Sequence, residues 1–130
     1  NVHFVFCYPP QQDTEQLTPN LVAGAMYFSS NEVLYGRYWG AIENYELLHF
    51  EACYYQGIEY SIQKELISFN PGTQGEHKIS RGFKPIATLS YHQLQLEPFH
   101  NAVENFCKQE KLGNSEYMKD CEQRLPFKKV

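Results

Sequence analysis

Side chains that could take part in catalysis or ligand binding are concentrated in the glycine-containing segment FNPGTQGEHKISRGFKP, residues 69–85. Within it, Glu76 or His77 could accept a proton, because carboxylates and imidazoles are common general bases. Lys78 and Arg81 could hold a phosphate or a developing oxyanion. These two cations are three residues apart, so they would share one face of a helical turn. Together the four side chains predict a ligand site with a cationic part and a proton-accepting part.

The same segment has a purely structural interpretation. Glu76 could pair with Arg81 or Lys78 to fix the loop, and His77 could be a surface residue that makes a hydrogen bond. Gly75 would let the backbone approach a ligand closely, yet glycines in such a loop can also serve only to satisfy turn dihedral angles. The sequence leaves both interpretations open.

Residues upstream of this segment could belong to the same site. Arg37, in the stretch YGRYWG, stands among aromatic residues, where it could stack on Tyr35 or Trp39 and reach a carboxylate or phosphate. Glu51 could act as a general base, but an ion pair with Arg37 fits equally well. Glu59 follows Glu51 by eight residues and would lie on roughly the same helical face.

Aromatic residues near these candidates could form a stacking surface for a sugar or a nucleobase. They are Trp39, Tyr54, Tyr55 and Tyr60. Aromatics at helical and strand spacing are more often part of a core, so we expect core positions here, and a structural role for His49. The histidines lack metal-ligand spacing and the four cysteines contain no C-x-x-C pair. We therefore predict no metal site and buried, reduced thiols.

Hydrophobic patterning predicts the elements that must position these side chains. In chain order we expect a strand over residues 1–7, a hairpin of strands over 21–30 and 32–42, a helix over 46–65, a short strand over 67–69, a strand over 84–94, a helix from about residue 97, and a further short helix over 114–125. Strands alternating with helices indicate an α/β or α+β fold, with helices packed on the faces of a sheet.

Length and composition set broader limits. A chain of 130 residues with 42% hydrophobic residues is the size of one compact domain. Its net charge of -4 gives no overall basic field of the kind that drives nonspecific nucleic-acid binding, although a local basic patch stays compatible with it. No apolar run is long enough to span a membrane, and the first residues lack a signal-peptide pattern. We therefore expect a soluble, cytoplasmic protein without a membrane span.

Two stretches carry a resemblance to a known family: LYGRYWG, residues 34–40, and HFEACYYQGIEYSIQKELISFNPGTQGEHKISRGFKP, residues 49–85. They resemble the peptidoglycan ("peptidogalycan") biosynthesis/recognition family, FemAB-like proteins within the GNAT acyltransferase superfamily. The resemblance implies a GNAT-like mixed sheet flanked by helices, in which the hairpin feeds a central helix and the following strands form an acyl-donor cleft.

The resemblance also bears on domain organisation. FemAB-like proteins carry two such lobes in tandem, whereas a chain of 130 residues holds one. We expect residues 20–130 to form the single GNAT-like domain. Residues 1–19 would be an N-terminal strand and linker, a remnant standing where most of a first lobe is missing.

By implication from the family, this is an acyl or aminoacyl transferase domain that acts on a peptidoglycan precursor or another amine. The resemblance then suggests catalytic roles for Glu76, His77 and Glu51, and substrate-binding roles for Lys78, Arg81, Arg37, Trp39 and Gly75. The donor would be acyl-CoA or aminoacyl-tRNA. GNAT enzymes hold the CoA pyrophosphate on a glycine-rich turn, but residues 43–51, ENYELLHFE, lack glycine and carry three glutamates, which favours aminoacyl-tRNA.

The same residues are also compatible with a noncatalytic function. The chain could be a noncatalytic recognition or oligomerisation module that keeps the GNAT fold and binds a cell-wall precursor or a protein partner. A sheet that has lost its partner lobe would expose an edge or an apolar face, and homodimerisation could cover it.

Overall fold

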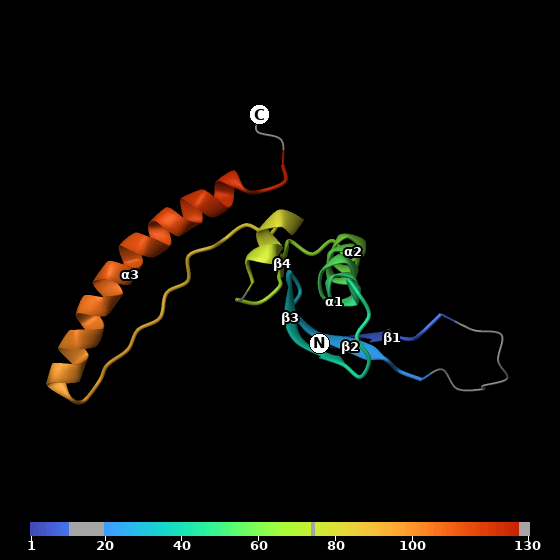
Figure 1. The fold of residues 1–130 in the computed structure, drawn as a ribbon, viewed down its shortest axis with the longest axis horizontal. Coiled ribbons are helices and arrows are strands. Elements are labelled where there is room, and N and C mark those ends of the chain that lie inside the picture. Colours follow the sequence, from blue (N-terminus) through green and yellow to red (C-terminus); the bar gives the residue numbers. More distant parts are fainter. Residues whose placement is uncertain (11–19, 74, 128–130) are drawn as a thin grey trace. The chain divides into compact units, whose positions relative to one another are not determined.

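A computed structural model describes residues 1–10, 20–73 and 75–127 of the chain. The chain divides into two compact units, Asn1–Gln74 and Gly75–Val130, which are described separately below. Figure 1 shows the ribbon with its labelled elements. Among the described residues, no helix combines the length and apolar character needed to cross a membrane.

A four-stranded sheet forms the centre of unit Asn1–Gln74. It consists of β1 (Val2–Cys7), β2 (Ala23–Ser29), β3 (Val33–Ala41) and β4 (Ser68–Asn70), in that spatial order. The first three strands are antiparallel, and β4 runs parallel to β3. The predicted first strand, the hairpin and the short strand are therefore confirmed, as their aromatic and β-branched composition suggested.

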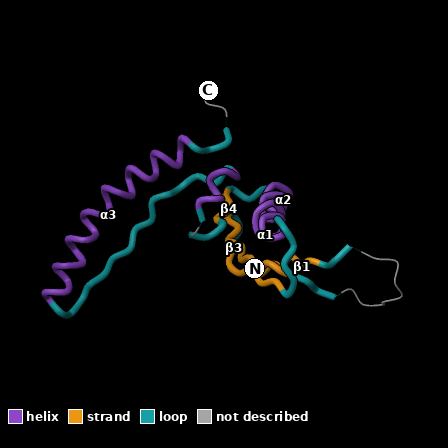
Figure 2. Tube along the Cα trace, in the orientation of Figure 1, coloured by secondary structure: helices purple, strands orange, loops and turns teal. Residues whose placement is uncertain are grey.

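A helix crosses one face of this sheet, as the ribbon and the tube show (Figures 1 and 2). It is made of α1 (Leu48–Phe50), the π-helical turn η1 (Glu51–Tyr55) and α2 (Gln56–Gln63). This confirms the helix predicted over residues 46–65. The π-helical turn was not predicted, because an apolar period of three to four residues is compatible with either kind of helix.

The core of this unit lies between the helix and the sheet. Its buried centre consists of Ala25, Tyr27, Leu34 and Ala52. Gly57 brings α2 close to the sheet: a Cβ built there would stand 2.6 Å from two ring carbons of Phe69. The helix backbone at Gly57 therefore packs directly against side chains of the sheet, with no room for a Cβ between them.

The unit Gly75–Val130 contains η2, a 3₁₀ helix (Glu76–Arg81), and α3 (Glu97–Gln123). The helix predicted from about residue 97 is confirmed, with a proline in its first turn. The tail is not a separate short helix, since α3 continues through Gly113 to Gln123. An isolated glycine lowers helix stability without necessarily ending a helix.

The strand predicted over residues 84–94 is wrong, because this segment is neither strand nor helix in the structure. Ile86, Leu89 and Tyr91 are strongly exposed there, at 71%, 85% and 93%. Strand composition reflects how well side chains pack on a half-buried sheet, and within its unit this segment joins no sheet. The fold class is a mixed α+β arrangement; its finer GNAT-like geometry stays a prediction.

Candidate functional site

The predicted site residues fall in both units. Arg37, Trp39 and Glu51 belong to unit Asn1–Gln74, and the remaining five, Gly75, Glu76, His77, Lys78 and Arg81, belong to unit Gly75–Val130. The second group lies together on η2 and at Gly75, the residue just before it; the sequence was interpreted as a loop here, so the 3₁₀ helix was not predicted. Each group is therefore judged within its own unit.

The start of η2 depends on a glycine. Gly75 has φ of 104°, a backbone conformation that side chains other than glycine rarely adopt. The ring of His77 also fills the space that a Cβ at Gly75 would need. A glycine is therefore needed at position 75 to make room for the His77 ring, and this structural reason explains it without a ligand.

Glu76 is held by the end of α3. Its carboxylate lies 3.2 Å from Nη1 of Arg124 and accepts a hydrogen bond from the Tyr117 hydroxyl at 3.3 Å. A hydrogen bond with Cys121, together with partial burial and the Glu76 carboxylate, raises the pKa of Tyr117 to about 12. The sequence had suggested Lys78 or Arg81 as the partner of Glu76. The partner in the structure is Arg124, which is far away in sequence and was not predicted.

The cationic part of η2 is partly buried. Lys78 is buried, with 8% of its surface exposed, and Arg81 donates a hydrogen bond from Nη1 to the His77 carbonyl at 2.8 Å. Partial burial and then the charges of Lys78 and Arg81 lower the pKa of His77 below its usual value. The neutral form of His77 is therefore favoured over the charged form relative to an ordinary histidine.

A β-bulge in β3 decides where the YGRYWG side chains go. Met26 is opposite Tyr38 while Tyr27 is opposite Gly36, so Arg37 is the extra residue. Its guanidinium lies 5.3 Å from the ring centroid of Tyr38. The stacking partners predicted for Arg37 were Tyr35 and Trp39. The shift turns Trp39 toward the helix, where its ring meets that of His49 at 5.4 Å.

The remaining aromatic candidates divide between core and surface. Tyr54 is buried and packs edge-on against His49, and Tyr60 meets His3 with ring centroids 4.7 Å apart. Tyr55 is 47% exposed. The expectation of core positions is confirmed for Tyr54, and Trp39 and Tyr60 pack against the core. The structural role expected for His49 stays a prediction.

A pocket of about 410 Å³ lies where β1 ends and the helix begins. It is lined by Tyr8, Pro9, Pro10, Val22, Tyr45, Glu46, Leu47, Leu48, Glu51 and Tyr55. Most of this lining is apolar or aromatic, and its two charged members are carboxylates. Of the predicted site residues, Glu51 is the one that lines it.

The backbone at the mouth of this pocket is unusual in two respects. Leu47 has φ of 64°, a left-handed conformation that is costly for a residue with a branched side chain. The helix it leads into continues as the π-helical turn Glu51–Tyr55, where Gln56 N–H bonds to the Glu51 carbonyl five residues earlier. Strained residues and π-helical turns both occur preferentially at functional sites.

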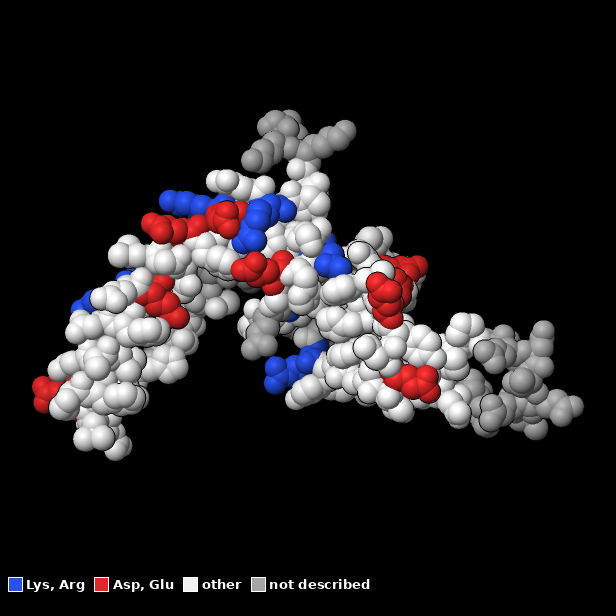
Figure 3. Space-filling model, viewed as in Figure 1, with Lys and Arg blue, Asp and Glu red and all other residues white. Residues whose placement is uncertain are grey.

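The electrostatics of the pocket are acidic. Glu51 accepts a hydrogen bond from the Gln56 amide at 2.8 Å, and among the described residues no ion pair joins it to Arg37. Burial, and secondarily the charge of Glu51, raises the pKa of Cys7 at the end of β1. Acidic side chains also gather over the region of α1 and α2 in the space-filling view (Figure 3). Such a site suits a cation such as an alkylammonium group and repels phosphate.

Sequence reasoning missed the other pocket residues. Tyr8, Pro9 and Pro10 were assigned to a linker, and Tyr45 and Leu47 were not singled out at all. The three glutamates of ENYELLHFE were recognised as unfavourable to phosphate. That charge pattern was the available sequence signal for the pocket, because a leucine with a left-handed backbone conformation cannot be recognised from sequence.

Comparison with known proteins adds the family. The FemAB-like family, described as "Peptidogalycan biosysnthesis/recognition", matches residues 13–129. No curated protein and no solved structure matches the chain. Because the family match extends over most of the sequence, including both stretches that carried the resemblance, the chain belongs to the FemAB-like family of peptidoglycan biosynthesis and recognition.

Proposed function

We propose that this chain takes part in the transfer of an acyl or aminoacyl group to an amine of a peptidoglycan precursor, and that the pocket at the start of the helix receives the acceptor amine. The observation that carries the proposal is an apolar pocket whose charged lining residues are Glu46 and Glu51. An ammonium group gains a charge-assisted hydrogen bond there, and the tyrosines cover its alkyl chain.

In the proposed reaction, the Glu51 carboxylate orients the acceptor and takes a proton from its nitrogen. The amine then attacks the carbonyl carbon of the donor, so a C–N bond forms and the ester bond of an aminoacyl-tRNA, or the thioester bond of an acyl-CoA, breaks. After the attack the nitrogen loses a second proton, which the leaving oxygen or sulfur takes up, and Glu51 releases the first proton to solvent. His77, Lys78 and Arg81 belong to the other unit, so the proposed step at Glu51 does not use them, and the roles expected for them in proton acceptance and phosphate binding stay predictions for that unit.

Binding of a muropeptide with a free side-chain amine tests this proposal by calorimetry. Glu51→Gln should weaken binding about 10- to 100-fold, because a hydrogen bond to a charged group contributes roughly 1.5–3 kcal/mol. Glu59→Gln is the matched control, since Glu59 is also an exposed glutamate of the helix but does not line the pocket. Equal binding of the N-acetylated muropeptide would refute an amine site.

Noncatalytic recognition is the second candidate function. It is favoured by Glu76, whose carboxylate already binds Arg124 and Tyr117. Mass spectrometry after incubation with the muropeptide and either aminoacyl-tRNA or acyl-CoA separates the two. A product heavier by one acyl group supports transfer and names the donor, and saturable binding without product supports recognition.

A further inference from the structure

The sheet of unit Asn1–Gln74 has one face that its helix does not cover. Val2, Phe4 and Phe6 of β1 point to this face and are 49%, 56% and 56% exposed. The rings of Phe4 and Phe6 stack with their centroids 5.7 Å apart. Large apolar side chains so placed on a sheet are rare on monomeric proteins and typical of interaction sites.

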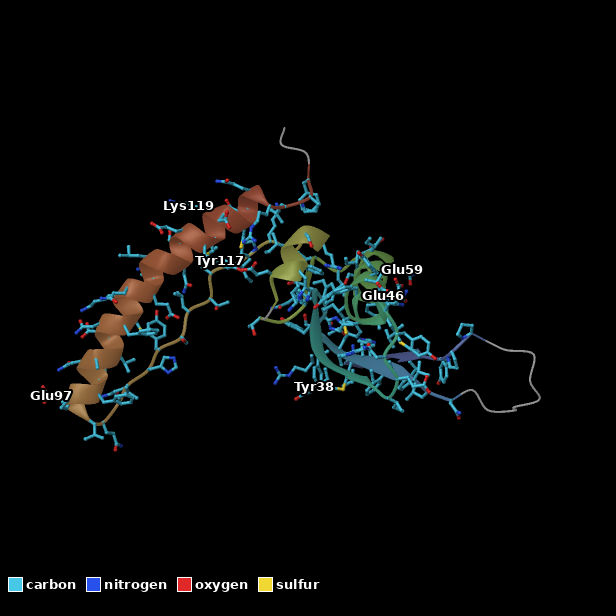
Figure 4. All side chains as sticks on the ribbon, viewed as in Figure 1. Tyr38, Glu46, Glu59, Glu97, Tyr117 and Lys119 are labelled. Atoms are coloured by element: carbon cyan, nitrogen blue, oxygen red, sulfur yellow. The ribbon has the colours of Figure 1, made fainter. Side chains whose placement is uncertain are left out.

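Register extends this apolar surface across three strands. Residues directly opposite one another in antiparallel strands point to the same face. The resulting rows are Val2–Phe28–Tyr35, Phe4–Met26–Tyr38 and Phe6–Gly24–Gly40. The bulge at Arg37 is what returns Tyr38 to this face, and Figure 4 shows Tyr38 on the side of the sheet away from Glu46 and Glu59.

The chemistry of this open face suits an apolar partner. None of the nine residues in its three rows is charged. The charged group beside these rows is the Arg37 guanidinium, which lies 5.3 Å from the ring centroid of Tyr38. The charge therefore lies at the β3 margin of the face, and the phenylalanine rings of β1 can be covered without desolvating it. The face is uneven, since β1 carries two phenylalanine rings, whereas Gly40 on β3 has no side chain and a Cβ there would meet no atom within 4 Å; this open space at Gly40 is called the glycine hollow below.

We propose that a second copy of this chain covers the open face, so that two sheets pack face to face as a two-fold sandwich. The exposed parts of its large side chains sum to roughly 600 Å² per copy, taking 150–250 Å² for a fully exposed aromatic side chain. Two copies would then bury about 1,200 Å², the lower end of the range for specific interfaces. A two-fold operation places the phenylalanine ridge of one copy against the glycine hollow of the other.

The pocket lies on the helix side of the sheet, so dimerisation and amine binding can be measured separately. Sedimentation of the full chain over about 1–100 μM should show a monomer–dimer equilibrium, the range expected for a small interface. Phe4→Lys and Tyr38→Lys should each raise the dissociation constant at least tenfold. Both positions are solvent-exposed, and circular dichroism should show that each variant keeps its fold.

Ile62→Lys is the matched control. Ile62 is 73% exposed but lies on α2, on the other side of the sheet, so its replacement should leave the dissociation constant unchanged. A wild-type chain that is monomeric throughout this range would overturn the proposal. So would a dimer that persists in the Phe4 and Tyr38 variants, because its contacts would lie elsewhere.

Discussion

Replacing Gly57 with alanine tests how closely the helix approaches the sheet. In the structure, a Cβ at this position would stand 2.6 Å from Cε1 and Cζ of Phe69 and 3.1 Å from a ring carbon of Tyr27. Carbon atoms in ordinary contact are about 3.5–4.0 Å apart. Tyr27 is 2% exposed and Phe69 packs against the same core, so neither ring can move freely.

Two opposing terms set the expected effect. Removing a glycine from a helix interior stabilises the folded state by about 0.5–1 kcal/mol. Forcing an extra methyl group into a packed core costs about 1–3 kcal/mol. We therefore expect Gly57→Ala to lower the free energy of unfolding by up to about 2.5 kcal/mol. For a unit of this size, each 1 kcal/mol corresponds to a fall in melting temperature of about 4–8 °C.

Thermal unfolding followed by fluorescence of Trp39, the single tryptophan, reports on this unit. Gly113→Ala is the matched control: this glycine also lies inside a helix, but its added Cβ would meet no atom within 4 Å. The control should stabilise its own helix, measured by circular dichroism, by about 0.5–1 kcal/mol. If Gly57→Ala stabilises the protein as much as Gly113→Ala does, the reasoning that the helix and the sheet are in close contact at Gly57 is wrong.

Three further predictions follow from individual contacts. Tyr27→Phe should cost about 1–3 kcal/mol in chemical denaturation, because the buried Tyr27 hydroxyl donates to the Ala52 carbonyl; an unchanged midpoint would contradict this. The lowered pKa of His77 means that the unfolded chain binds more protons near pH 6.5, so stability is full above that pH and falls as pH drops through it; His77→Asn should flatten this part of the profile. Glu76→Gln removes the ion pair with Arg124, so hydrogen exchange should quicken in the last turn of α3, with no change expected in its first turn.

Local pattern was sufficient for most elements. The alternation in residues 1–7, the turn between the hairpin strands and the apolar stripe of the long helix each depend on neighbours in sequence, and all three elements are present. The segment over residues 84–94 was misassigned because a strand exists only where another strand completes its hydrogen bonds. The same limit applied to Glu76, whose partner Arg124 is 48 residues away.

The sequence by itself determined the FemAB-like family, the strands and the helix up to residue 70, the start of the helix near residue 97, and an acidic stretch at the start of the first helix that disfavours phosphate. Only the tertiary structure decided that Glu51 lines a pocket, that Leu47 is left-handed, and that a bulge at Arg37 turns Trp39 toward the helix and Tyr38 to the open face of the sheet. Pattern records the preferences of one residue and its near neighbours. A pocket or a bulge arises from contacts between distant segments, which compete with those local preferences and in these places outweigh them.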